Sequence, residues 1–225
     1  MAVTQRDIVL AAVSLLQQHG LDGVTFRRIA AELGVTAPTL YWHVESKREL
    51  LDLVAEELLR RHSATLMDRP PPGQPWWTWL ELRSREMFDA LVETRDAPAV
   101  LAGNRPSPES LPSLEAVLDT LVSAGIPPTD AQQALFAIGS YVVGSATEWQ
   151  AERARAATRP PGDAQLAAAL REGDFPTLSA AVRGLVGQPP RATFEFGLRL
   201  LVDGMRARYA AAADEPDGAG TPVRR

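Results

Sequence analysis

The stretch TFRRIAAELGVTAPTLYWHV, residues 25–44, has the pattern of two short helices joined by a tight turn. Ala30 is small enough to let two helices approach closely, and Gly34 permits the turn between them. Val35 and Leu40 are apolar residues suited to fill the angle between the helices. These residue types predict a helix-turn-helix, a motif whose second helix enters the major groove of DNA with its N-terminal end leading.

The motif and the residues just after it carry side chains that can contact DNA. Thr39, Tyr41 and Lys47 can donate hydrogen bonds to phosphates. Arg27, at the start of the preceding helix, can pair with a guanine through two hydrogen bonds. The alternative is a buried helical hairpin in which Tyr41 and Trp42 fill a core. We favour DNA contact, because the polar and aromatic side chains of one short helix cannot all face inward.

The composition indicates a globular protein and excludes several kinds of site. The 225-residue chain is 45% hydrophobic and 23% charged, so it can bury a sizeable core. It has no cysteine, which excludes disulfides, thiolate metal sites and cysteine nucleophiles. No apolar run reaches the roughly 18 residues that a membrane span needs, so we expect a cytoplasmic protein without a membrane partner. The net charge of −5 argues against DNA binding by the whole surface, but residues 1–50 contain five basic and five acidic residues.

Helix signals continue on both sides of the motif, and no strand-like alternation is sustained. Thr4 and Gly20 are expected to bound a first helix. Ser46 and Glu49 form a capping box for a fourth helix that runs to about residue 67. Further helices are predicted over residues 76–95, over residues 113–125, from a Thr129 cap toward Arg155, and from a Thr193 cap to Tyr209, with a loose segment of about twenty residues beginning at TRPPGDAQ.

The predicted fold is therefore all-α, with an N-terminal three-helix domain and a C-terminal helical bundle. We divide the chain into a helix-turn-helix domain (residues 1–45), a connecting helix (46–67), a ligand-binding and dimerisation domain (68–211) and a disordered tail (212–225). The two long helices of the bundle carry apolar residues on more than one stripe, so each has two faces to bury. Both faces can be buried in the core of a single chain, or one of them can pair with a second copy in an isologous four-helix interface.

Sequence motifs for catalysis are missing. The chain has only three histidines, no histidine pair at metal spacing, no G-x-S-x-G sequence and no glycine-rich phosphate loop. Adjacent carboxylates at Glu56 and Glu57 are interpreted as part of a solvated helix face. We therefore predict no enzyme activity, no catalytic residue, no metal site and no cofactor.

Residues 24–59, VTFRRIAAELGVTAPTLYWHVESKRELLDLVAEELL, resemble the DNA-binding region of the TetR family of transcriptional repressors. The similarity is strong over residues 4–62, where it is nearest to the tetracycline-responsive members, and weaker at LAGNRP, residues 101–106. The resemblance implies a homodimer that binds a palindromic operator. It also implies that a ligand bound in the C-terminal bundle moves the fourth helix and releases the DNA.

Carried over residue by residue, the resemblance implies DNA contacts by Arg27, Pro38, Thr39, Tyr41, Trp42, His43 and Lys47. Ala37 belongs to the same surface but departs from the pattern, because tetracycline-responsive members have a base-reading glutamine there. An alanine side chain has no hydrogen-bond donor, so we expect a different operator sequence.

The ligand domain departs further from the tetracycline-responsive members. Ser63, Arg83 and Leu101 stand where those proteins hold drug and magnesium through His and Asn side chains. Leu101 cannot coordinate a metal, so we expect a small, largely hydrophobic or aromatic effector without magnesium. The residues predicted to bind it are His62, Arg83, Met87, Leu101, Arg105, Tyr141 and Trp149.

Two alternatives stay open at this point. Each apolar residue of this set, taken singly, is also suited to an ordinary place in the core, and His62 is as well suited to a plain surface role. The protein could also be a DNA-binding regulator with no small-molecule effector. We favour the effector, because a simple DNA anchor has no need of the long apolar helical region after residue 67.

Overall fold

The computed structural model describes residues 3–62, 69–158, 170, 175–185, 188–189 and 191–209. Its α-helices are α1 (Gln5–His19), α2 (Phe26–Leu33), α3 (Ala37–Tyr41), α4 (Lys47–His62), α5 (Trp76–Glu93), α6 (Ala97–Leu101), α7 (Leu111–Ser123), α8 (Pro128–Thr158), α10 (Pro176–Leu185) and α11 (Ala192–Tyr209). Two 3-10 turns, η1 (Leu21–Gly23) and η2 (Pro108–Ser110), lie between them. No described residue belongs to a β-strand, which confirms the predicted all-α fold.

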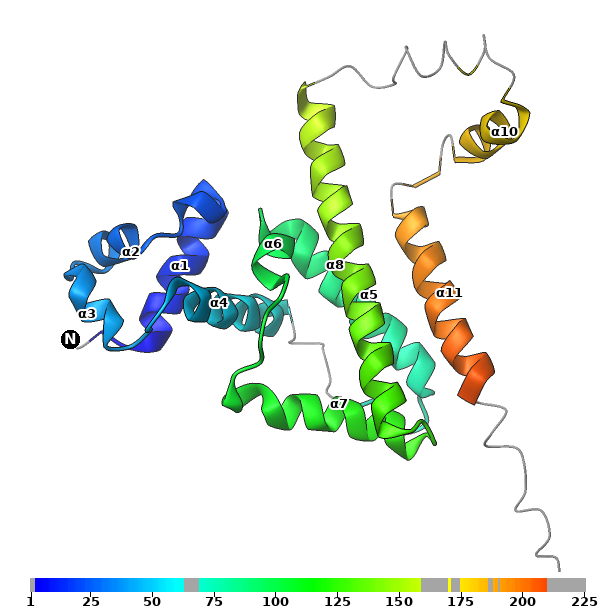
Figure 1. Cartoon of the computed structure of the whole chain (residues 1–225), viewed down its shortest axis with the longest axis horizontal. Coiled ribbons are helices and arrows are strands. Elements are labelled where there is room, and N and C mark those ends of the chain that lie inside the picture. The colour runs from blue at the N-terminus through cyan, green and yellow to red at the C-terminus, as the bar shows by residue number, and fades with distance from the viewer. Residues whose placement is uncertain are drawn as a thin grey trace, which may run out of the picture.

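The first three helices form a small unit at one end of the molecule (Figure 1). The Thr4 hydroxyl accepts a hydrogen bond from the Asp7 N–H (3.2 Å), and the Asp7 carboxylate accepts one from the Thr4 N–H (2.9 Å). This reciprocal cap starts α1. Gly34 ends α2 in the left-handed region (φ 67°), where a residue with a Cβ is strained. Ile29 and Leu40 are fully buried in the same apolar core as Ile8 and Leu16 of α1, as the helix-turn-helix prediction requires.

Helix α4 joins this unit to the rest of the chain. Only half of the predicted capping box forms: the Ser46 hydroxyl accepts from the Glu49 N–H (3.1 Å), but the Glu49 carboxylate accepts from the Glu45 N–H (2.7 Å). Leu50, Val54 and Leu58 form the buried side of α4, which contacts α1 as well as α5 and α6. The predicted end of this helix, residues 63–67, lies outside the described residues.

The second unit is built on α5, α8 and α11, which run side by side in Figure 1 and contact one another. Phe88, Leu121, Val142 and Leu198 are among the buried residues of its core. The Gln150 side-chain amide donates to the carbonyls of Leu91 and Thr94 (2.7 and 2.8 Å) and thereby fixes the turn between α5 and α6. No described helix is long and apolar enough to cross a membrane.

Several predicted helix boundaries were wrong. Helix α8 starts at Pro128 and not after a Thr129 cap, because proline already has a helical φ and needs no N–H partner in the first turn. Helix α11 starts at Ala192, which leaves Thr193 inside the first turn. The five-residue helix α6 and the ten-residue helix α10 were not predicted. Helix α6 is too short to show apolar periodicity, and α10 follows a stretch rich in proline, glycine and alanine that was predicted to be loose. Most of the predicted loose segment and all of the tail lie outside the described residues.

Candidate DNA interface and effector site

The surface of the first unit exposes the aromatic residues that follow Thr39. The Trp42 side chain is 88% exposed, and Tyr41 is also exposed. The alternative that these two rings fill a core is therefore wrong. The other predicted DNA-contact residues divide into exposed Arg27, Pro38 and Lys47 and half-buried Ala37, Thr39 and His43.

Three residues that were not predicted to contact DNA hold this surface in place. The Phe26 ring packs against the Tyr41 ring, with centroids 4.6 Å apart. The hydroxyls of Thr36 and Thr39 lie 2.9 Å apart, and the Gln5 side-chain amide donates to the His43 carbonyl (3.1 Å). Phe26 and Gln5 are far in sequence from the groups they support, so helical spacing gives no signal for these contacts.

In the second unit, an aromatic cluster joins three helices. The Phe88 ring of α5 stacks on the Phe194 ring of α11 (centroids 4.0 Å apart, planes 13° apart). The Tyr141 ring of α8 stacks on the Phe194 ring, with centroids 5.9 Å apart. The Trp149 ring meets the Phe88 ring edge-on, with centroids 5.8 Å apart. Two predicted effector residues, Tyr141 and Trp149, are thus brought together by two phenylalanines.

Of the two polar groups in this cluster, the Tyr141 hydroxyl has hydrogen-bond partners and the Trp149 N–H has none among the described residues. The Tyr141 hydroxyl lies 3.2 Å from the Thr193 carbonyl and 3.0 Å from the Phe194 carbonyl, so its proton is shared between them. The Trp149 Nε1–H is buried and has no acceptor among the described residues. A buried unpaired donor costs about 1–3 kcal/mol, so this N–H needs a partner that the described chain does not supply.

An ion-pair network beside the cluster ties α5 to α11. The Arg85 guanidinium donates to Glu81 and to Glu195, both at 2.8 Å. Arg191 donates to Glu195 (3.0 Å) and to Asp89 (2.6 Å). Partial burial raises the pKa of Glu195, but the bonds and charges of the two arginines outweigh burial and lower its pKa overall. The network was not predicted, although Glu81 and Arg85, like Arg191 and Glu195, stand at i,i+4 spacing.

The remaining predicted effector residues are more scattered. Met87 is half-buried against the core, Leu101 is buried on α6, and the Arg83 guanidinium lies 5.3 Å from the Trp79 ring. Arg105 lies near the start of α4, where its backbone N–H donates to Asp52 (3.4 Å). The side chain of His62 lies outside the described part of the structure.

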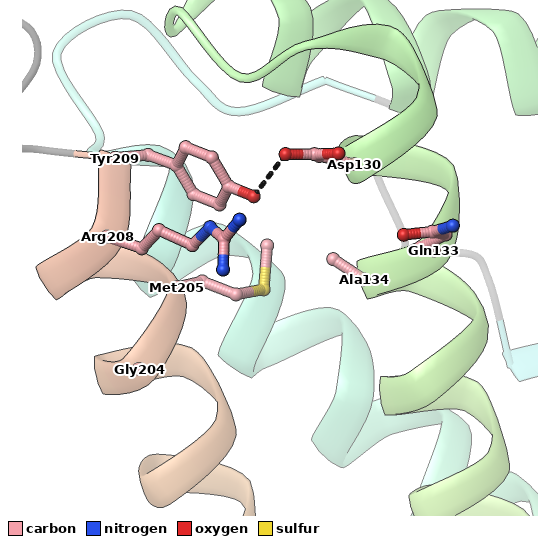
Figure 2. A pocket seen from close by; sticks show the side chains of 7 residues that line it. All are labelled: Asp130, Gln133, Ala134, Gly204, Met205, Arg208 and Tyr209. Carbon is pink, nitrogen blue, oxygen red and sulfur yellow. Dashed lines mark hydrogen bonds between the residues drawn. The ribbon is translucent and has the colours of Figure 1, made fainter.

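The hollows on the described surface include two of a few hundred Å³. One, of about 320 Å³, lies between the start of α8 and the end of α11 and is lined by Asp130, Gln133, Ala134, Gly204, Met205, Arg208 and Tyr209 (Figure 2). The Tyr209 hydroxyl donates to Asp130 there (2.7 Å), and this bond raises the pKa of Tyr209. The other, of about 510 Å³, is lined by Ser46, Arg48, Glu49, Asp52, Gly103 and Arg105. Arg105 is thus the one predicted effector residue that lines either hollow.

The outer faces of α8 and α11 carry exposed apolar side chains. Phe136 of α8 is 75% exposed, and Phe196 and Leu200 of α11 are each 60% exposed. Small residues Ala137, Ser140 and Gly144 share the exposed face of α8. The opposite faces of both helices are buried in the chain's own core through Ile138, Val142, Phe194, Leu198 and Val202. Large apolar side chains left exposed in this way are typical of sites of association.

No group of three or more histidine, aspartate or glutamate side chains among the described residues is arranged to hold a metal ion. The acidic residues near the aromatic cluster are engaged with arginines, as the network above shows.

Comparison with known proteins matches both units. Residues 8–54 match the family model of bacterial regulatory proteins of the tetR family, and residues 69–209 match that of the tetracyclin repressor-like C-terminal domain. The class A tetracycline repressor protein from transposon 1721 of Escherichia coli is 36% identical over 201 residues, which cover 89% of this chain and 89% of that protein.

Solved structures agree with the fold. The Streptomyces coelicolor TetR family protein ActR in complex with (S)-DNPA superposes with a TM-score of 0.78 at 25% identity, covering 92% of this chain and 99% of that one. TetR(class A) in complex with 5a,6-anhydrotetracycline and magnesium gives a TM-score of 0.68 at 29% identity, covering 91% and 99%. Relatives of the same fold therefore bind different small molecules.

Proposed function

Because the chain belongs to the TetR family of bacterial regulatory proteins, we propose that it is a repressor that binds a palindromic operator as a homodimer and releases it when a small effector binds. Members of this family are DNA-binding regulators of transcription and not enzymes. The observation that carries the proposal is the exposure of Trp42 and Tyr41 at the end of α3. A large exposed aromatic side chain in a helix-turn-helix is accounted for by contact with DNA. We also propose a cytoplasmic location, where operator DNA lies.

We assign DNA contact to the predicted residues Arg27, Ala37, Pro38, Thr39, Tyr41, Trp42, His43 and Lys47. The dimer would form through the exposed apolar faces of α8 and α11, two helices from each subunit. We call the α1–α3 unit of each subunit its reading head. Such an isologous interface relates the two reading heads by a two-fold axis, so the operator should be palindromic. Its half-site centres should lie roughly 34–36 Å apart, or a small multiple of that distance.

We place the effector at the aromatic cluster, with Tyr141 and Trp149 among its contacts. The unpaired Trp149 Nε1–H favours an effector over the alternative of a regulator without one, because a ligand oxygen or nitrogen acceptor would satisfy it. Met87 and Leu101 would contribute apolar surface. Leu101 offers no metal ligand, so we expect binding without magnesium, unlike in TetR(class A) in complex with 5a,6-anhydrotetracycline and magnesium.

This proposal is tested by a gel shift on the intergenic DNA next to the gene, followed by titration with candidate aromatic ligands with and without a chelator. We expect binding to the fragment, release by a ligand, and the same release in the chelator. Isothermal calorimetry on the free protein measures the ligand affinity. Tight ligand binding that left the DNA complex intact would contradict the release mechanism, and ligand binding abolished by the chelator would contradict the metal-free site.

Two substitutions separate base reading from phosphate contact. Arg27→Ala should weaken operator binding by about 1–3 kcal/mol and relax the preference at one base pair, because a bidentate guanine contact is lost. Lys47→Ala should weaken all sequences about equally and lower the salt dependence of binding by roughly one counterion. Fluorescence anisotropy on operator variants at several salt concentrations measures both. An unchanged base preference in Arg27→Ala would show that the assigned base contact is wrong.

A further inference from the structure

The Glu56 carboxylate on α4 faces the loop that follows α6. Glu56 Oε1 accepts from the Ser107 N–H (2.5 Å), and its Oε2 accepts from the Ser107 hydroxyl (2.8 Å). The Ser110 hydroxyl lies 2.9 Å from Glu56 Oε1 and 2.9 Å from the Ser107 carbonyl, so it closes the same turn. The interpretation of Glu56 as part of a solvated helix face is therefore wrong, because this half-buried side chain is bound by residues more than fifty positions away.

The same face of α4 touches the same loop at two earlier positions. Asp52, one turn before Glu56, accepts from the Arg105 N–H (3.4 Å). Arg48, one turn earlier again, donates to the Ala102 carbonyl (3.4 Å). Residues spaced by four lie above one another on a helix, so α4 presents a single row of polar contacts to residues 102–110. The hydrogen bonds of Glu56 are the shortest in this row, and Glu56 is the residue of the row whose carboxylate accepts from two serine hydroxyls.

The neighbouring Glu57 provides a natural contrast. Its carboxylate accepts from Arg60 (2.8 and 2.9 Å) and from Arg61 (2.8 Å), and all of these bonds stay within α4. Glu57 therefore ties α4 only to itself. Glu56 ties α4 to a segment that leads directly to α6, the helix that carries Leu101 and contacts α4, α5 and α8.

We propose that Glu56, with Ser107 and Ser110, is a clamp that couples α6 to the reading head through α4. Glu56 is a positioning residue in this role, since it acts through the backbone of the loop and not on DNA or effector. The inference rests on the proposed function, because the clamp would link the proposed DNA interface to the proposed effector site. A shift of α6 would reach α4 through the hydrogen-bonded loop, and by reciprocity a restraint on the reading head would reach α6.

The test uses the full chain and operator DNA, so it needs no effector. Hydrogen–deuterium exchange of residues 97–110 is measured with and without a duplex carrying the intergenic sequence. In the unchanged protein we expect DNA to slow exchange in this segment by at least about fivefold, the lower end of typical allosteric coupling. Glu56→Ala should still bind the duplex but lose the effect on residues 97–110. Glu57→Ala should keep it, and Glu56→Gln, whose amide can still bond the serines, should keep part of it.

A DNA-induced change that persisted in Glu56→Ala, or that Glu57→Ala removed equally, would overturn the clamp. If the unchanged protein bound no duplex, the proposed function would fail, and the clamp would be judged in the free protein. There, Leu101→Ala should speed exchange at the start of α4 when Glu56 is present and have no further effect in the Glu56→Ala background. Equal effects of Leu101→Ala in both backgrounds would overturn the clamp on its own.

Discussion

Replacing Phe196 by glutamate should dissociate the proposed dimer into monomers and abolish the proposed operator binding. Phe196 is 60% exposed on α11, one helical turn before the exposed Leu200, and Phe136 of α8 is exposed as well. A buried aromatic residue at an interface contributes at least about 2 kcal/mol when it is central. A two-fold axis doubles the loss to about 4 kcal/mol, or about a thousandfold in the dimer dissociation constant.

Analytical ultracentrifugation measures the dimer constant, and a gel shift measures operator binding. The matched control is Leu111→Glu, because Leu111 is 53% exposed at the start of α7 and does not belong to the α8 and α11 faces. This control should remain dimeric and bind the operator. A Phe196→Glu protein that sedimented as a dimer would show that the assigned interface is wrong, whatever its affinity for DNA.

The second large effect is expected on stability, from Phe88→Ala. The Phe88 side chain is only 1% exposed and contacts Phe194, Trp149 and the Arg191 guanidinium, whose central carbon lies 5.6 Å from the ring centroid. Truncation of a buried phenylalanine costs about 3–5 kcal/mol, because the lost burial is joined by the cost of a cavity. For a chain of this size the midpoint of thermal unfolding should fall by roughly 10 °C.

Differential scanning calorimetry at a fixed protein concentration measures this change. Leu82→Ala on the same helix is the control, because the Leu82 side chain is exposed and its truncation should change stability little. Addition of apolar ligands of benzene size to Phe88→Ala should restore part of the loss if the cavity stays open. A Phe88→Ala protein as stable as the control would mean that the aromatic cluster is not the core of this unit.

Much of the reading head could be predicted from local signals. The Thr4 cap, the left-handed Gly34 and the buried Leu40 each act within a few residues of their position, so a short stretch of sequence is enough to identify them. Exposure of Trp42 also followed from the limited inward surface of one short helix. The aromatic character of Tyr141 and Trp149 marked them, but not the fact that Phe88 and Phe194 hold them together.

The sequence by itself determined the all-α fold and the helix-turn-helix, because helix periodicity, caps and glycine turns depend on near neighbours. The family followed from the resemblance of residues 24–59 to its DNA-binding region. Only the tertiary structure decided that Glu56 bonds to the loop after α6, that Arg191 joins α5 to α11 and that the Trp149 N–H has no acceptor in the described part of the chain. For Glu56 and Arg191 the bonding partner belongs to a different helix or loop, and for Glu56 it lies 51 residues away. Local patterns carry no information on such pairings, since these depend on how complete helices pack.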